Sequence, residues 1–233
     1  MKEINIDKYD KVLSGQFFKK KGKVLNVVGL TIEATGIEAK LGDLCIISPA
    51  DSSYKPIMSE VVGFKDGKTL LMPYEVTEGV GLGSMVETEG RPLCVMAGDF
   101  LLGKTLDGLG RPTDDIIPPE AVPYPVEAAP PDAMEREIID EVLPLGVRAV
   151  DGLITLGKGQ RIGIFAGSGV GKSTLLGMFA RNTKADINVI ALIGERGREV
   201  GEFIERDLGE EGMRRSVVVV ATSDRPALER NKA

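Results

Sequence analysis

Residues 166–174 form a short glycine-rich stretch whose residue types and spacing suit the binding of phosphate groups. The stretch consists of Ala166, Gly167, Ser168, Gly169, Val170, Gly171, Lys172, Ser173 and Thr174. A phosphate-binding loop has a glycine, any four residues and then Gly-Lys-Ser/Thr, and this stretch departs from that pattern only at Ala166. Glycines hold no side chain against an anion, so successive backbone N–H groups can converge on it. The stretch therefore predicts a site for ATP or a related nucleotide.

Within this stretch, three side chains are expected to contact the nucleotide. Lys172 supplies a positive charge to the β- and γ-phosphates, and a helix that begins near Lys172 adds the positive end of its dipole. The Ser173 hydroxyl is expected to bind Mg²⁺, and Thr174 is expected beside the α-phosphate. The alternative is a glycine-rich turn without a ligand, but the position of the stretch between an apolar run and a helical pattern argues against it.

Hydrolysis needs a further group that orients the attacking water. The apolar run at 187–193 is followed directly by Gly194, Glu195, Arg196 and Gly197. In a parallel sheet the carboxyl ends of the strands meet at one edge, where ligands bind. Glu195 is therefore a candidate general base, and Arg196 is a candidate for stabilising negative charge. A solvated cluster of loop charges is the alternative, and the pattern alone does not decide between the two.

The elements that must position these residues alternate along the chain. Apolar runs typical of strands, at 161–165, 187–193 and 216–222, alternate with helical patterns at 172–181 and 198–208. The valines of the last run suggest burial on both faces of a parallel sheet. Together the runs predict an open α/β fold.

The earlier part of the chain is rich in short strands separated by turn residues. β-rich runs occupy residues 23–28, 31–34, 44–48, 57–64, 69–72 and 84–87. Asp66-Gly67, between two of these runs, indicates a hairpin. This spacing is expected of a small barrel or sandwich.

The next part of the chain is rich in proline. Eight prolines fall between residues 108 and 146, which favours an extended connector because proline interrupts helices. We therefore divide the chain into a lead-in at 1–22, a β-barrel domain at 23–95, and a third part at 96–233 that holds the connector and the nucleotide-binding domain.

The overall composition excludes several classes of function. The net charge of −6 argues against a dedicated nucleic-acid binder. The chain has no histidine, which removes Ser-His-Asp and Cys-His catalysis and most zinc sites. Cys45 and Cys94 are expected to be buried thiols and not a disulfide. No run approaches the roughly 18 apolar residues of a membrane span, so we expect a cytoplasmic or peripherally attached protein.

Residues 159–174, together with 194–200, resemble the flagellar and type III secretion ATPases, which are relatives of the catalytic subunits of rotary ATP synthases. The resemblance extends over most of the chain. Residues 28–36 resemble the N-terminal barrel of that family, 106–112 its interdomain segment, and 216–228 its following strand and helix. The resemblance implies a small all-β barrel followed by the first half of an α/β P-loop domain of the RecA type.

The resemblance also implies a function. It implies an ATP hydrolase that uses Mg²⁺, assembles as a homo-oligomer, usually a hexamer, and energises protein export through a flagellar or type III secretion apparatus. The implied partners are stator, stalk and gate proteins, export substrates and chaperones, and the implied location is the cytoplasm, peripheral to the inner membrane. In this family the glutamate at the position of Glu195 activates water, and the arginine at Arg196 approaches the γ-phosphate. The run at 205–212 favours the flagellar branch.

The chain also departs from the family. The family carries a Walker B aspartate, an adenine pocket, a neighbour-directed arginine and a helical C-terminal domain on later segments, and no residue up to Ala233 matches them. Asp224 does not directly follow its apolar run, and we interpret it as a helix N-cap. We therefore expect a truncated chain that is inactive alone, with the strand at 216–222 at or near an open sheet edge.

Two other ring-forming ATPases are alternatives. One is a catalytic or nucleotide-binding subunit of the rotary ATP synthase type. A non-catalytic subunit would favour glutamine at position 195, and the form of the 166–174 loop favours the secretion branch. The other is an RNA-translocating ring ATPase, which would need a basic barrel face with exposed aromatic residues. Aromatic residues make up only 5% of this acidic chain, so we expect no nucleic-acid partner.

Overall fold

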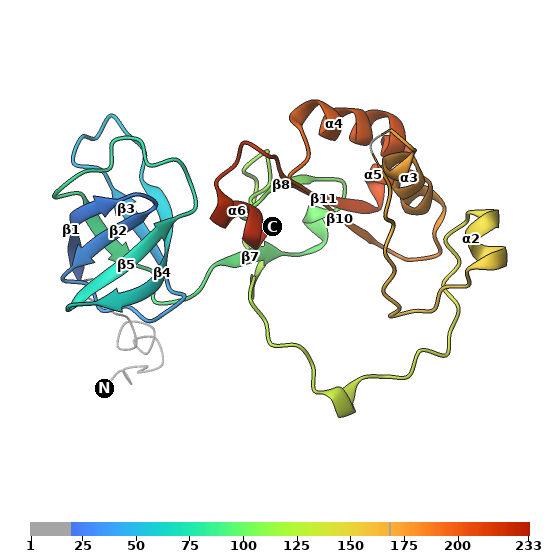
Figure 1. Ribbon diagram of the computed structural model, residues 1–233, viewed down its shortest axis with the longest axis horizontal. Coiled ribbons are helices and arrows are strands. Elements are labelled where there is room, and N and C mark those ends of the chain that lie inside the picture. Colours follow the sequence, from blue (N-terminus) through green and yellow to red (C-terminus); the bar gives the residue numbers. More distant parts are fainter. Residues whose placement is uncertain (1–19, 168) are drawn as a thin grey trace, which may run out of the picture. The chain divides into compact units, whose positions relative to one another are not determined.

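A computed structural model describes residues 20–167 and 169–233, and the chain divides into two compact units, Met1–Pro92 and Leu93–Ala233 (Figure 1). Each unit has a hydrophobic core of its own, so the fold of each can be explained from its own residues. Within these described ranges, no helix combines the length and the apolar character needed to cross a membrane.

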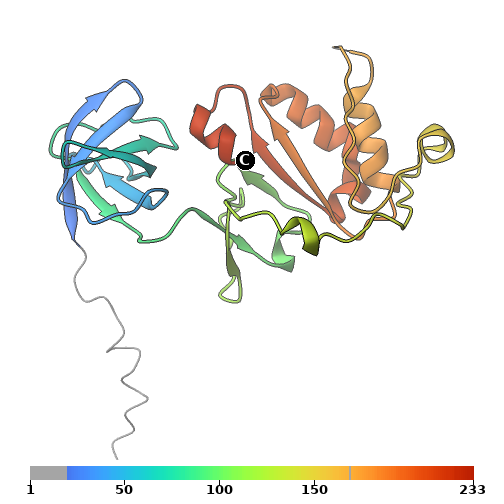
Figure 2. The ribbon, with the colours of Figure 1, turned by 60° about the horizontal axis from the view of Figure 1, so that its bottom comes forward.

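The first unit is a closed barrel of six strands, shown in blue to green in Figure 2. The strands are β1 (Lys21–Val28), β2 (Thr31–Thr35), β3 (Leu44–Ser48), β4 (Ile57–Lys65), β5 (Lys68–Pro73) and β6 (Met85–Thr88). Neighbouring strands are antiparallel and follow the order β1-β2-β5-β4-β3-β6, with β6 pairing back to β1. Closure removes exposed strand edges. The predicted all-β barrel is confirmed.

Alternating burial explains why these residues close into a barrel. Along β5 every second side chain is buried, beginning at Thr69, as expected for a strand with one face toward a core. The core consists of Val24, Ile32, Ala34, Cys45, Ile47, Ile57, Val61, Leu71 and Val86. Burial raises the pKa of the Cys45 thiol to about 11, so this thiol stays protonated and unreactive near neutral pH.

A tight turn joins β4 to β5. Asp66 and Gly67 have φ angles of 50° and 71°, and the flanking Lys65 and Lys68 are paired across the two strands. Positive φ at both central residues is the geometry of a type I′ hairpin, whose twist matches that of the strands. The hairpin predicted at Asp66-Gly67 is confirmed.

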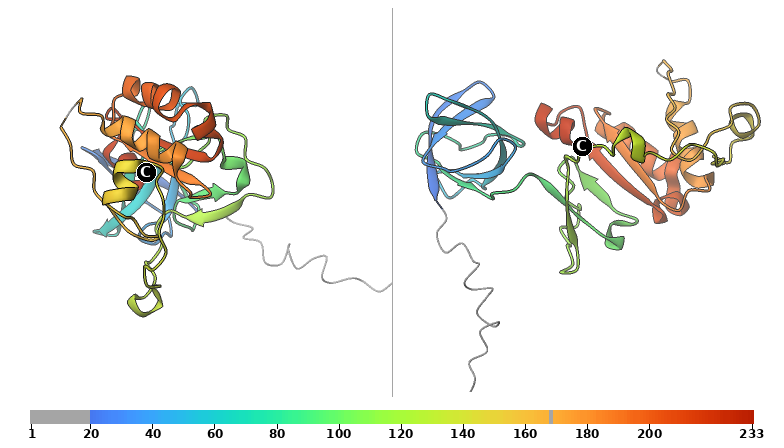
Figure 3. Two further views of the ribbon diagram at one scale, coloured as in Figure 1. Left: turned by 90° about the vertical axis from the view of Figure 1, so that its right-hand side faces the viewer. Right: turned by 90° about the horizontal axis from the view of Figure 1, so that it is seen from below.

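The second unit is built on a three-stranded parallel sheet (Figure 3). Its strands are β8 (Thr105–Asp107), β10 (Asn188–Ile193) and β11 (Ser216–Ala221), with β11 in the middle. One face is covered by α3 (Lys172–Asn182), α4 (Gly197–Glu202), a π-helical turn (Phe203–Leu208) and α5 (Gly209–Arg214). The buried side chains between helices and sheet are Ala180, Leu192, Val200, Phe203, Leu208 and Val218. The predicted α/β fold is confirmed.

The remaining elements of this unit are short. They are β7 (Cys94–Ala97), β9 (Val122–Pro125), α2 (Arg148–Leu153), α6 (Ala227–Lys232) and 3₁₀ turns at Asp99–Leu101 and Ala133–Glu135. β7 and β9 pair as an antiparallel ribbon, so the proline-rich segment supplies one of its strands. The domain boundaries expected at residues 22 and 95 stay predictions.

Three local predictions for this unit are wrong. Residues 161–165 form no strand, because a strand requires a neighbour that completes its ladder of hydrogen bonds, and none of the described strands pairs with them. The strand predicted at 216–222 was expected at or near an open edge of the sheet. It is central instead, because β8 pairs with its second side. Pro226, whose ring fixes φ, takes the N-cap position of α6 in place of Asp224.

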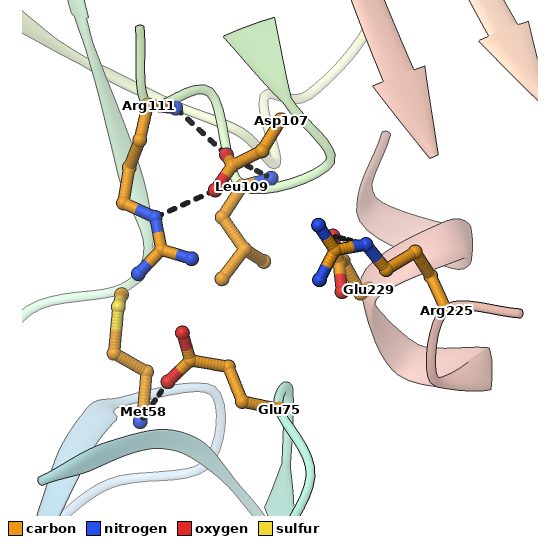
Figure 4. Close-up of polar contacts among 7 residues, drawn as sticks. All are labelled: Met58, Glu75, Asp107, Leu109, Arg111, Arg225 and Glu229. Atoms are coloured by element: carbon orange, nitrogen blue, oxygen red, sulfur yellow. Dashed lines mark hydrogen bonds and ion pairs between the residues drawn. The ribbon is translucent and has the colours of Figure 1, made fainter. Parts of the chain in front are cut away.

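The turn that follows β8 is held by one carboxylate (Figure 4). The backbone N–H groups of Leu109 and Arg111 donate to Asp107 over 3.0 and 2.9 Å, and Arg111 Nε donates to the same carboxylate over 2.7 Å. On α6, Glu229 is only 2% exposed, and its carboxylate lies 3.8 Å from Arg225 Nε. Burial raises the pKa of Glu229, Arg225 opposes the rise, and Asp107 adds to it.

This raised pKa predicts a specific dependence of stability on pH. The folded protein holds a proton on Glu229 more tightly than the unfolded chain does, whose glutamate pKa is about 4.3. The stabilising contribution of Glu229 is therefore fully present below that pH and is lost as the pH rises through the folded pKa. Relative to Glu229→Gln, which cannot titrate, the wild type should lose free energy of unfolding as the pH rises above about 4. Urea unfolding of both proteins, followed by circular dichroism, measures this difference, and a wild type that gains stability relative to the variant would contradict the prediction.

Candidate nucleotide-binding site

The glycine-rich loop leads into α3 through a left-handed turn. Gly171 is the N-cap of α3 with a φ of 95°, and Gly169 has a φ of 76°. Residues that carry a Cβ atom rarely adopt such backbone angles, so glycine is needed at both positions. Lys172 and Ser173 are then the first two residues of an 11-residue helix, where free N–H groups and the helix dipole favour an anion. Ser168 lies outside the described residues.

The loop lines an open cavity of about 580 Å³. Apart from its chain neighbours, a Cβ atom added at Gly167, Gly169 or Gly171 would have no described atom within 4 Å, so the space beside these three glycines is open. The residues that line the cavity are Ala166, Gly167, Gly169, Gly171, Lys172, Ser173, Thr174, Glu195, Glu199, Glu202 and Asp207. Val170 is 67% exposed and is absent from this lining. The loop thus presents its backbone, Lys172 and two hydroxyls to a space large enough for a phosphate chain.

Glu195 faces the same cavity from the end of β10. Gly194 N–H donates to the carbonyl of Ala221 over 2.7 Å, and Ser223 N–H donates to the carbonyl of Glu195 over 3.1 Å. These bonds fix the backbone at the carboxyl edge of the sheet, where the sequence placed Glu195. The Glu195 carboxylate lies 3.7 Å from Lys172 Nζ, and both side chains are partly exposed to solvent. The structure therefore brings together the two residues on which binding and hydrolysis were predicted to depend.

Arg196 lies beside this cavity and is absent from its lining. It is the N-cap of α4, its side chain is 70% exposed, and Nη1 lies 3.1 Å from a Glu199 carboxylate oxygen. This ion pair directs the guanidinium along α4, so the predicted contact of Arg196 with the γ-phosphate stays a prediction.

Three acidic residues of the cavity were missed by the sequence reasoning. They are Glu199 and Glu202 on α4 and Asp207 in the π-helical turn. Burial raises the pKa of Glu199, but a hydrogen bond with Glu195 and the charge of Arg196 outweigh it, and the net shift is downward. Residues three apart on a helix share a face, so the spacing of Glu199 and Glu202 was the available signal.

The donor set of the cavity fits a magnesium nucleotide. Backbone N–H groups, the start of a helix and Lys172 suit phosphates, and the Ser173 hydroxyl with nearby carboxylates supplies the oxygen atoms that Mg²⁺ prefers. Mg²⁺ usually retains water and phosphate ligands and takes few ligands from the protein. The arrangement can therefore bind a nucleotide and place a carboxylate next to its phosphates.

Comparison with known proteins agrees with this geometry. Residues 146–233 match the family model for the nucleotide-binding domain of the ATP synthase alpha/beta family. The chain is 54% identical over 217 residues to the flagellum-specific ATP synthase of Bacillus subtilis (strain 168), covering 93% of this chain and 50% of that protein. It is 51% identical over 213 residues to the type 3 secretion system ATPase of Xanthomonas euvesicatoria, covering 91% of this chain and 48% of that protein.

A solved structure is similar over the same extent. It is the assembled ATPase EscN in complex with its central stalk EscO, from the type III secretion system of enteropathogenic E. coli. The TM-score is 0.80 and the identity 45%, over 91% of this chain and 51% of that chain. The chain thus spans about half the length of the relatives it matches.

The cavity predicts that Lys172 carries much of the affinity for nucleotide. Lys172→Ala should weaken binding of a fluorescent ATP analogue by about tenfold or more, since a hydrogen bond to a charged group is worth about 1.5–3 kcal/mol. Lys158→Ala is the matched control, because Lys158 also pairs with a glutamate, Glu141, and lies outside the cavity lining. Equal affinities of the Lys172 and Lys158 variants would disprove the assignment of the phosphate-binding loop.

Proposed function

We propose that this chain, which is similar to the flagellum-specific ATP synthases and the type III secretion ATPases, contains the phosphate-binding site of an ATP hydrolase that energises protein export. The observation that carries the proposal is the position of Glu195, 3.7 Å from Lys172 and on the wall of the loop cavity. A loop that only bound nucleotide would not need a carboxylate there.

In the proposed reaction the protein positions ATP and a water molecule. The N–H groups of the loop and the Lys172 ammonium hold the phosphates and offset the negative charge that develops during transfer. The Glu195 carboxylate orients the attacking water and accepts its proton at Oε1 or Oε2. Lys172 then exchanges its contact with Glu195 for the γ-phosphate, which leaves the carboxylate available to the water.

We propose that Ser173 holds Mg²⁺ together with the phosphates. When bound, the ion would supply positive charge that offsets the negative charge of the phosphates. The proposed role of Arg196 is to approach the γ-phosphate, which would require its side chain to leave Glu199. The 70% exposure of the Arg196 side chain leaves it room to do so.

We also propose that the natural protein works as a homo-oligomer. The similar solved structure is described as an assembled ATPase in complex with a central stalk protein. By homology we infer a ring, usually a hexamer, that contacts a stalk protein, stator and gate proteins of the export apparatus, chaperones and export substrates. Such a protein would act in the cytoplasm, peripheral to the inner membrane.

Relatives favour this function over the rotary ATP synthase alternative. The family model for residues 146–233 covers the wider ATP synthase family and does not separate the two. Flagellum-specific and type III secretion proteins, however, are 44–54% identical to this chain over about nine-tenths of its length. The identity extends through the barrel and so does not reflect a shared phosphate-binding motif alone.

Glu195→Gln tests the proposed chemistry. In the natural protein that carries these residues, it should retain ATP affinity and lose about 10²–10⁴-fold in turnover, because an amide can hold a water but cannot accept its proton. Glu210→Gln is the control, since Glu210 is a highly exposed residue of α5. Phosphate release and analogue binding measure the two quantities. Turnover within a few-fold of the wild type would exclude Glu195 as the base.

A secretion assay tests the biological role. A strain that produces only the Glu195→Gln protein should accumulate export substrates inside the cell, whereas the Glu210→Gln strain should secrete them normally. Normal secretion by both strains would contradict a role in energising export.

A further inference from the structure

The helix that follows Glu195 does not continue regularly. After α4 the chain enters a π-helical turn, Phe203–Leu208, in which Gly209 N–H donates to the carbonyl of Ile204, five residues earlier. A π turn holds one residue more than an α-helical turn and often occurs at functional sites. Phe203 and Leu208 at its two ends are buried in the core beneath the helices. The turn is therefore anchored at both ends.

This turn lies directly against the helix of the phosphate-binding loop. α3 and the π-helical turn are packed side by side, as Figure 3 shows in orange and red. A Cβ atom added at Gly177 of α3 would lie 2.4 Å from the carbonyl oxygen of Asp207 and 2.7 Å from its carbonyl carbon. Both are main-chain atoms, which cannot rotate away as a side chain can. Only glycine permits this approach.

The contact joins the two parts that carry the proposed chemistry. α3 begins at Lys172, and Gly177 lies little more than one turn further along the same helix. α4 begins just after Glu195 and leads into the turn that contains Asp207. Asp207 also lines the cavity of the loop. A change in the separation of α3 from the turn would therefore shift the helix that begins at Lys172 relative to the helix that begins just after Glu195.

We propose that Gly177 is a positioning residue, which sets the distance between the phosphate-binding loop and Glu195 through its contact with the backbone of Asp207. The inference rests on the proposed function, because that function requires Glu195 to lie close to the phosphates. The nucleotide contacts themselves come from α3 and the loop, so a shift of the turn affects hydrolysis far more than binding.

The test compares two identical substitutions in the natural protein. Gly177→Ala places a methyl group against Asp207, whereas Gly201→Ala on α4 places it where no atom lies within 4 Å. Both changes replace a helical glycine and raise helix propensity equally. Gly177→Ala should lower kcat by about 10²-fold, the effect expected of a displacement near 1 Å, and leave KM within about threefold. Gly201→Ala should retain wild-type kcat and KM.

The outcomes separate this inference from the proposed function. If Gly177→Ala matches Gly201→Ala in kcat, or if it raises KM and leaves kcat unchanged, the positioning role is wrong. If the natural protein without either substitution hydrolyses no ATP, the proposed function is wrong. The coupling of the two helices is then still tested by the measurement below.

Hydrogen exchange of the wild-type protein provides that second measurement, which also decides the case if Gly177→Ala does not fold. A non-hydrolysable ATP analogue should slow amide exchange in residues 203–208 as well as in 172–177, because the two segments move together. Protection confined to 172–177 would overturn the inference.

Discussion

The separation of the Lys172 ammonium from the Glu195 carboxylate, 3.7 Å, is the quantity on which the proposed chemistry depends. The two residues are 23 positions apart in the chain and belong to different elements. Lys172 is fixed by the start of α3, and Glu195 is fixed by the pairing of β10 with β11 and by the hydrogen bond from Ser223 to its carbonyl. The close approach of Gly177 to Asp207 then relates α3 to the segment that follows Glu195. The start of α3 and the pairing of β10 with β11 therefore both contribute to this one distance.

The two units differ in whether their sheets have free edge strands. The barrel closes on itself, so every strand pairs its backbone hydrogen-bonding groups with those of two neighbours, and its core needs no helix. The sheet of the second unit is open, and its parallel strands require helices against a face to bury their valines. An open parallel sheet also has a carboxyl edge at which loops from separate strands meet. That edge is where Glu195 lies, so the proposed catalytic arrangement belongs to the second unit.

Local patterns predicted most of this structure. The six barrel strands were predicted within two residues of their observed ends, because one face of each is buried and turn residues separate them. The hairpin at Asp66-Gly67 and the start of α3 at Lys172 depend on residues next to one another in the chain, so they too were predicted. The family resemblance supplied the all-β barrel and the P-loop domain together.

Features that depend on distant partners were not predicted. β8 is only three residues long and becomes a strand through its pairing with β11, more than 100 residues later. Residues 161–165 have a suitable pattern but lack a partner within the described structure. The π-helical turn could not be predicted from the sequence pattern, because the spacing of Val200, Phe203, Ile204 and Leu208 also suits a regular α-helix. The importance of Gly177 became visible only when Asp207 was placed against it.

A crystal structure of this chain with Mg²⁺ and a non-hydrolysable ATP analogue tests the central claim most directly. The account predicts that the β-phosphate accepts hydrogen bonds from the N–H groups of the 166–174 loop. It also predicts that Lys172 Nζ contacts the β- and γ-phosphates and that the Glu195 carboxylate faces the γ-phosphate. An analogue whose phosphates lie outside this loop, or a Glu195 carboxylate directed away from the γ-phosphate, would contradict it.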